Sequence, residues 1–191
     1  MAYDLGQIQL LLIEDNPNMR SLVKAMLVAL GVKLVRDVSN GQQAIDTVEN
    51  FTPDLIITDW MTAPVDGLQF SKFVRFDDDS PDIFTPIILM SGHTEQWRVN
   101  MARDAGVNEF LAKPISAKTL YDRLLAVIEK PHPFVRTKSY FGPCHRRVNS
   151  WDYDGPERRF NAGKADPASE INVPNEAGSD ELLNTLYQPG L

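Results

Sequence analysis

The chain alternates short apolar runs with longer segments in which apolar residues recur every three or four positions. The short runs are rich in Ile, Leu and Val, which is typical of strands buried on both faces of a parallel sheet. The longer segments have the period of helices with one buried face. We therefore expect five strands, at 8–13, 33–38, 55–59, 87–90 and 109–112, and five helices, at 17–30, 40–50, 67–76, 95–105 and 117–130.

Local signals place several helix boundaries. Asn16 followed by Pro17 combines a preferred N-cap residue with a proline at the first helical position. Gly31 stands where the first helix is expected to end, and Ser116 is expected to cap the last helix, which Pro131 ends. Strands and helices that alternate in this way build βαβ units, so the predicted class is α/β with helices on both faces of a parallel sheet.

Polar side chains mark the ends of four of the expected strands. Glu14-Asp15 follow the first strand, Asp59 closes the third, Ser91 follows the fourth and Lys113 follows the fifth. The carboxyl ends of parallel strands meet at one edge of a sheet, where open α/β folds bind their ligands. We therefore expect these side chains to form one site.

The residue types in this site indicate phosphoryl transfer. Three neighbouring carboxylates repel one another unless a cation lies between them, and Mg²⁺ prefers carboxylate, water and phosphate oxygens. Asp59 is the candidate acceptor, because a carboxylate can form a covalent phosphoryl intermediate when the transferred charge is neutralised. Lys113 would neutralise one phosphoryl oxygen, and the Ser91 hydroxyl would donate a hydrogen bond to another.

Composition and charge narrow the class of protein. The 191 residues are 43% hydrophobic and 24% charged, which is typical of globular proteins. No apolar run approaches the roughly 20 residues of a membrane span, and the first residues show no secretory pattern. The single cysteine, Cys144, excludes an internal disulfide and fits a reducing, cytoplasmic setting. The net charge of −7 opposes non-specific nucleic-acid binding by the whole surface.

Residues 8–130 resemble the receiver domain of two-component response regulators. The matching positions lie in or after the expected strands and in the loop after the acceptor. They are Glu14-Asp15, Asp59, Asp66-Gly67, Ser91-Gly92, Phe110 and Lys113-Pro114. The resemblance implies a flavodoxin-like fold, a doubly wound five-stranded parallel sheet of order 2-1-3-4-5 with five helices.

The resemblance also implies roles for the acidic residues. Asp59 would receive a phosphoryl group from a histidine of a sensor kinase or of a phosphotransfer protein. Asp15, Asp59 and the backbone carbonyl of Met61 would hold Mg²⁺, and Glu14 would act on the ion through water. Such a protein is not an enzyme in the usual sense, because it catalyses only its own phosphorylation and dephosphorylation.

Two further roles follow from the resemblance. Ser91 and Lys113 would sense the phosphoryl oxygens, and movement of Ser91 would be coupled to rotation of the Phe110 ring. That rotation would change the surface around the fourth helix and the fifth strand, so phosphorylation biases a two-state element. The face formed by the fourth helix, fifth strand and fifth helix is a candidate surface for homodimers.

The loop after Asp59 departs from the family pattern. Members often read Asp-x-x-Met-Pro-x-x-Asp-Gly, whereas here methionine and proline stand at Met61 and Pro64, each displaced by one position in opposite directions. The length of the loop is kept. We expect the Met61 side chain to hinder the attack of water on a phosphoryl group at Asp59 and to lengthen the phosphorylated state.

The last third of the chain differs in charge from the predicted receiver at 1–130. Residues 131–165 hold seven basic and three acidic residues, a net charge of +4, and residues 166–191 hold five acidic and no basic ones. We therefore predict an irregular basic extension at 131–165 and a disordered acidic tail at 166–191. Cys144 and His145 are adjacent with only His132 nearby, which is not the spacing of a zinc site.

The basic extension contains an imperfect repeat. Residues 140–147 read Tyr-Phe-Gly-Pro-Cys-His-Arg-Arg, and residues 153–159 read Tyr-Asp-Gly-Pro-Glu-Arg-Arg. These arginines would bind an acidic partner or the acidic receiver itself; two alternatives are contact with nucleic acid and an extended linker. The extension is too short for a conventional helix-turn-helix domain.

The leading interpretation is a receiver that signals through protein contacts or acts as a phosphate shuttle or sink. The alternative keeps the receiver and gives the basic extension a nucleic-acid-binding output. A phosphatase built on the same aspartyl chemistry is disfavoured, because such enzymes need an acid/base aspartate just past the nucleophile, and Met61 stands there.

Overall fold

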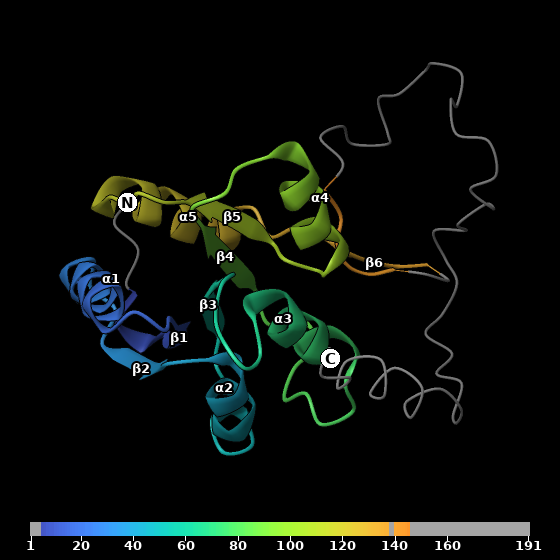
Figure 1. Ribbon diagram of the computed structural model, residues 1–191, viewed down its shortest axis with the longest axis horizontal. Coiled ribbons are helices and arrows are strands. Elements are labelled where there is room, and N and C mark those ends of the chain that lie inside the picture. The colour runs from blue at the N-terminus through green and yellow to red at the C-terminus, as the bar shows by residue number, and fades with distance from the viewer. Residues whose placement is uncertain (1–4, 138–139, 146–191) are drawn as a thin grey trace. The chain divides into compact units, whose positions relative to one another are not determined.

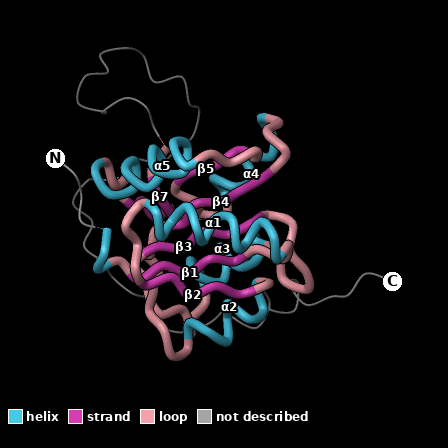
Figure 2. The backbone as a smooth tube through the Cα atoms, turned by 90° about the vertical axis from the view of Figure 1, so that its left-hand side faces the viewer, coloured by secondary structure: helices cyan, strands magenta, loops and turns pink. Residues whose placement is uncertain are grey.

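Five parallel strands form the central sheet of the computed structural model, which describes residues 5–137 and 140–145. Their order is β2-β1-β3-β4-β5, as the resemblance implied, and Figure 2 shows the strands following one another in this order. The strands are β1 (Gln9–Ile13), β2 (Leu34–Val38), β3 (Leu55–Asp59), β4 (Ile87–Ser91) and β5 (Glu109–Ala112).

Five helices cover the two faces of this sheet. They are α1 (Pro17–Ala29), α2 (Gly41–Val48), α3 (Gly67–Phe76), α4 (Gln96–Asp104) and α5 (Ala117–Glu129), and a short 3₁₀ turn (Leu5–Gln7) precedes β1. Helices α1 and α5 pack on one face and α2, α3 and α4 on the other (Figure 1). The predicted α/β class, strand order and helix count are confirmed, and each boundary lies within about two residues of its prediction.

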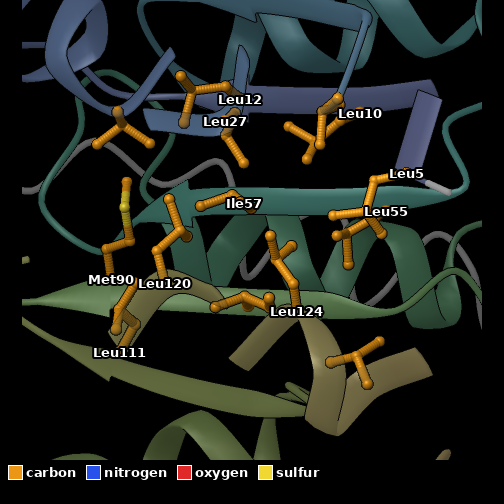
Figure 3. Packing of buried hydrophobic residues seen from close by; sticks show 14 residues of the cluster. Leu5, Leu10, Leu12, Leu27, Leu55, Ile57, Met90, Leu111, Leu120 and Leu124 are labelled. Atoms are coloured by element: carbon orange, nitrogen blue, oxygen red, sulfur yellow. The ribbon is translucent and has the colours of Figure 1, made fainter. Parts of the chain in front are cut away.

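The core follows from the alternation of side chains along each strand. Leu10 and Leu12 of β1 point toward α1 and α5, whereas Leu11 and Ile13 point toward the opposite face. Figure 3 shows the first of these layers, in which Leu27 of α1 and Leu120 and Leu124 of α5 meet apolar residues of β1, β3, β4 and β5. Strands β1, β3 and β4 are buried on both faces, and this explains why their sequences are nearly continuous runs of apolar residues.

A two-stranded antiparallel hairpin follows α5, and the sequence did not predict it. Strands β6 (Phe134–Arg136) and β7 (Phe141–Pro143) pair with each other, and β7 packs against α3 and α4. The compact unit that holds the sheet therefore ends at His145, beyond the boundary expected at residue 130. The second copy of the repeat, at 153–159, and the acidic tail at 166–191 lie outside the described residues.

Aromatic side chains attach the hairpin to the α/β unit. Phe84, in the loop before β4, makes edge-to-face contacts with Phe134 at 5.1 Å and with Phe141 at 5.7 Å between ring centroids. Gly142 allows β7 to approach closely, since a Cβ atom there would lie 2.9 Å from the Cα atom of Gly106. The first copy of the repeat thus contributes a docked strand, whose Phe141 is buried.

Beneath the hairpin lies a buried arginine. Arg75 of α3 is 1% exposed, and its guanidinium donates hydrogen bonds of 2.9 Å to the carbonyl oxygens of Gly106 and Ile83. A third bond of 3.0 Å goes to Oδ1 of Asn108, and the Phe134 ring lies 5.1 Å from the guanidinium carbon. Burial lowers the pKa of Arg75 to about 10, so the group remains charged at neutral pH.

Within the described part of the chain, none of the helices has the length and apolar character needed to cross a bilayer.

We predict that Arg75→Met lowers the free energy of unfolding by about 2–4 kcal/mol, because buried carbonyl and amide acceptors lose their charged donor. Urea unfolding followed by circular dichroism measures the change. Lys72→Met is the matched control, since Lys72 is exposed on the same helix, and it should shift stability by no more than about 0.5 kcal/mol. Equal losses in the two variants would contradict a supporting role for Arg75.

Candidate phosphoacceptor and metal site

The register of the parallel sheet brings the predicted site residues to one edge. Ile13 pairs with Thr58, Asp59 with Met90, and Ser91 with Ala112, so the carboxyl ends of β1, β3, β4 and β5 lie level with one another. The side chains that follow these pairs therefore meet at the edge where α/β folds bind ligands.

Three carboxylates gather at this edge, as predicted. Glu14, Asp15 and Asp59 each present an oxygen within 4.8 Å of the oxygens of the other two. Glu14 and Asp59 are buried, whereas Asp15 is exposed. Hard oxygen ligands of this kind, with one side open to water, fit Mg²⁺, which keeps several waters when it binds proteins.

Lys113 joins the two buried carboxylates. Its Nζ atom lies 2.9 Å from Oε2 of Glu14 and 2.9 Å from Oδ1 of Asp59. Burial raises the pKa of Glu14, although the hydrogen bond from Lys113 acts in the opposite direction. For Lys113, burial favours the neutral amine, but the hydrogen bonds to Asp59 and Glu14 outweigh it and raise its pKa. The ammonium group is therefore charged and held beside the candidate acceptor.

Gly67 lets α3 begin directly against the acceptor strand. A Cβ atom at this position would lie 2.2 Å from the carbonyl oxygen of Asp59, a distance that real Cβ contacts do not reach. Asp66 caps the helix: it accepts a 2.7 Å bond from the Gln69 amide, and the Gln69 side chain accepts one from the Asp66 amide. The Asp-Gly pair after Asp59 thus serves close packing and capping, and Asp66 is not part of the carboxylate group.

Ser91 and Phe110 occupy positions consistent with a sensing pair. The Ser91 hydroxyl is buried and accepts a 3.0 Å bond from the His93 amide, and the Lys113 amide donates 2.8 Å to the Ser91 carbonyl. Phe110 is partly buried against the core beneath α2, α3 and α4. Their switching roles stay predictions, as does the metal-binding role of Met61, whose side chain is 60% exposed in the loop after Asp59.

The sequence analysis missed Arg20 of α1. Its Nη1 atom donates a 2.7 Å hydrogen bond to the carbonyl oxygen of Glu14, and its Nε atom lies 3.3 Å from Asp37. Arg20 therefore orients the turn that carries the acidic pair. Residues 14, 20 and 37 share no helical or strand spacing, so no pattern in the sequence pointed to this contact.

A second missed group lies beside Asp59. Trp60 is buried, and the Arg98 guanidinium of α4 lies over its ring at 5.3 Å and over the Trp97 ring at 4.5 Å. This cation–π contact links the start of α4 to the residue after the candidate acceptor. No pattern in the sequence pointed to this contact.

Comparisons with known proteins agree with this geometry. The family profile described as response regulator receiver domain matches residues 10–125. The chain is 26% identical over 123 residues to chemotaxis protein CheY-3 of Vibrio cholerae, covering 64% of this chain and 93% of that protein. It is 31% identical over 122 residues to chemotaxis protein CheY1 of Helicobacter pylori, covering 63% and 97%.

Solved structures show the same fold. The receiver domain of the sensor histidine kinase PA1611 from Pseudomonas aeruginosa, solved with a magnesium ion in its active site cleft, superposes with a TM-score of 0.57 at 30% identity, covering 64% of this chain and 98% of that one. The response regulator CheY4 of Vibrio cholerae gives 0.58 at 26% identity, covering 63% and 98%. Because the family profile spans more than half of the residues, this chain belongs to the response regulator receiver domain family.

Proposed function

We propose that Asp59 accepts a phosphoryl group from a phosphohistidine of a histidine kinase or of a histidine phosphotransfer protein. The observation that carries the proposal is the position of the Lys113 ammonium, 2.9 Å from both Asp59 and Glu14 within a three-carboxylate group. A structural salt bridge needs only one of these carboxylates. Two buried acids that share one ammonium group, with an exposed third acid beside them, are suited to handling the charge of a phosphoryl group.

Asp59 is the nucleophile in this transfer. A carboxylate oxygen of Asp59 attacks phosphorus, the P–N bond of the phosphohistidine breaks, and the imidazole keeps the electron pair and takes up a proton. Hydrolysis later breaks the P–O bond, releases inorganic phosphate and restores the carboxylate. The chain thus acts only on its own phosphoryl group.

Neighbouring residues hold the charge during this step. Lys113 neutralises a phosphoryl oxygen, and the buried Ser91 hydroxyl donates to another. When Mg²⁺ is bound by Asp15, Asp59 and the Met61 carbonyl, with Glu14 acting through water, it supplies further charge neutralisation at the phosphoryl oxygens. Arg20 keeps the turn that carries Glu14 in place through its bond to the Glu14 carbonyl.

The proposed output is protein contact or a role as phosphate shuttle or sink. Phosphorylation would draw Ser91 toward the new oxygens and change the position of Phe110, so the α4, β5 and α5 face presents a different surface to a downstream protein or to a second copy. The alternative output, nucleic-acid binding by the basic extension, concerns residues that lie mostly outside the described part of the chain.

We predict that the chain gains one labile phosphate when incubated with acetyl phosphate and Mg²⁺, and that Asp59→Asn abolishes the gain because the nucleophile is lost. Intact-protein mass spectrometry measures the label. The exposed Asp78 provides the control, and Asp78→Asn should be labelled like the parent. Labelling of Asp59→Asn to the parental level would refute the proposed acceptor, and rapid multiple turnover of acetyl phosphate would indicate a phosphatase.

We predict that Lys113→Met binds Mg²⁺ roughly fivefold more tightly or better, because removal of a nearby positive charge relieves repulsion of the ion. The same variant should be phosphorylated more slowly, since a phosphoryl oxygen loses its cationic partner. Calorimetric titration and the acetyl phosphate assay measure the two effects. Lys33→Met, which removes an exposed lysine from the turn after α1, should change neither. Weaker Mg²⁺ binding by Lys113→Met would contradict this assignment.

We predict that Met61→Asn shortens the phosphorylated half-life, because a small polar side chain admits water where the exposed methionine hinders it. The measurement is the decay of labelled protein after removal of acetyl phosphate. Met101→Asn changes another exposed methionine, on α4, and should leave the decay unchanged. An unchanged or longer half-life for Met61→Asn would rule out the shielding role.

A further inference from the structure

We propose that His132, His145 and Glu109 form a second metal site, for a Zn²⁺-class transition-metal cation, where the β6–β7 hairpin meets β5. The site is separate from the carboxylate group at Asp59 and does not depend on phosphoryl chemistry. Its ligands are imidazoles with one carboxylate, a set that suits Zn²⁺ and other borderline cations and is unsuited to Mg²⁺.

Antiparallel pairing brings the two histidines together. Phe134 pairs with Pro143 in the ladder, and the Cys144 amide donates 2.8 Å to the Pro133 carbonyl one step further out. The next step in this register places His132 directly across from His145. The two residues stand 13 positions apart in the sequence, which is not the spacing of a zinc motif, so the hairpin and not a short motif creates the pair.

The two rings have the separation of imidazoles that share one ion. Their centroids lie 5.2 Å apart with an angle of 53° between the planes. At Zn–N distances of about 2.0–2.1 Å, two imidazoles at a tetrahedral angle have centroids roughly 5 Å apart. The tilt itself is ordinary for two rings in contact, so the separation of the rings is the feature that agrees with a shared ion.

Glu109 supplies a third oxygen next to the pair. Its Oε1 atom lies 3.7 Å from Nε2 of His132, close to the roughly 3.4 Å between neighbouring ligand atoms in a tetrahedral zinc site. The other carboxylate oxygen, Oε2, accepts a 3.0 Å bond from Arg123, which orients the carboxylate and leaves Oε1 directed at His132. Ligating carboxylates are commonly held in this way by an outer hydrogen bond.

His145 is oriented by the main chain. Its Nε2 atom donates a 2.9 Å hydrogen bond to the Val107 carbonyl, which leaves Nδ1 as the ligand atom. A backbone carbonyl that binds the second ring nitrogen is the usual support of a metal-ligating histidine. Burial lowers the pKa of His145, although the hydrogen bond to Val107 acts in the opposite direction.

A rotation of the His132 ring is needed to complete the set. In the described residues, the three acidic residues of the phosphoacceptor site form the one group whose ligand atoms already lie within 4.8 Å of one another. His132 is 34% exposed, so its ring is able to turn toward Nδ1 of His145, and water completes the coordination. Cys144 directly precedes His145, just past the end of β7, and its thiol is not included in the site.

A bound ion would join the hairpin to β5 through side chains of both. The docked hairpin would then gain stability as the free metal concentration rises, because the undocked hairpin lacks the Glu109 ligand of β5.

The test is a Zn²⁺ titration of the full chain in saturating Mg²⁺, which occupies the acidic site and does not compete for imidazoles. Competition with a chromophoric chelator measures the affinity, and the absorption spectrum of Co²⁺ reports the geometry. We expect one Zn²⁺ per chain, a tetrahedral or five-coordinate Co²⁺ spectrum, and a higher melting temperature with Zn²⁺. His132→Gln and His145→Gln should each weaken binding about tenfold or more.

The third histidine of the chain provides the control. His93→Gln changes an exposed side chain in the loop before α4 and should bind Zn²⁺ like the parent, as should Cys144→Ser. Melting curves in a chelator show whether a variant remains folded, and the partly exposed His132 keeps the test valid if His145→Gln does not fold. Parental affinity in His132→Gln, or no Zn²⁺ binding by the folded parent at micromolar concentrations, would overturn the proposal.

Discussion

One ammonium group, that of Lys113, lies between two carboxylates at the edge of the sheet, and the geometry of the site depends on it. Without this charge, Glu14 and Asp59 would face each other at short range with little water to screen them. Burial, together with the charge of Asp59, raises the pKa of Glu14 even though Lys113 acts against it, and the raised pKa of Lys113 shows that its two partners more than compensate for its own burial. A positive charge is therefore held 2.9 Å from the carboxylate of Asp59.

This arrangement requires the sheet to be in exact register. Lys113 comes from β5 and Glu14 from β1, which are separated by β3 and β4 in the strand order. The bridge spans 99 positions in the sequence, so only the packed sheet can form it. Gly67 shows how tight this packing is, because any side chain there would meet the backbone of Asp59. The positions of the strands therefore determine both the packing of the core and the distances between the side chains of the site.

The hairpin adds a layer beyond what the length of the relatives accounts for, since alignments of 123 and 122 residues already cover 93% and 97% of the two chemotaxis proteins. It covers Arg75, a buried charge whose hydrogen bonds within the described residues go to neutral oxygens. Such a charge tolerates burial only when its donors are satisfied and an aromatic face covers it. The hairpin is therefore integral to the folded unit that ends at His145.

The sequence by itself determined the element order, the class of fold and the residues at the strand ends, because hydrophobic periodicity and helix-capping signals act over a few neighbouring positions. Glu14, Asp15, Asp59 and Lys113 were found in this way, since each follows a strong apolar run. The tertiary structure alone decided the contacts of Arg20 with Glu14, of Arg75 with the hairpin and of His132 with His145. These pairs join positions whose separation carries no period. Strands β6 and β7 have only three residues each, and β7 contains glycine and proline, so their sequences carry no strand signal. Their stability comes from aromatic and hydrogen-bonded contacts with the rest of the unit, which only the tertiary structure provides.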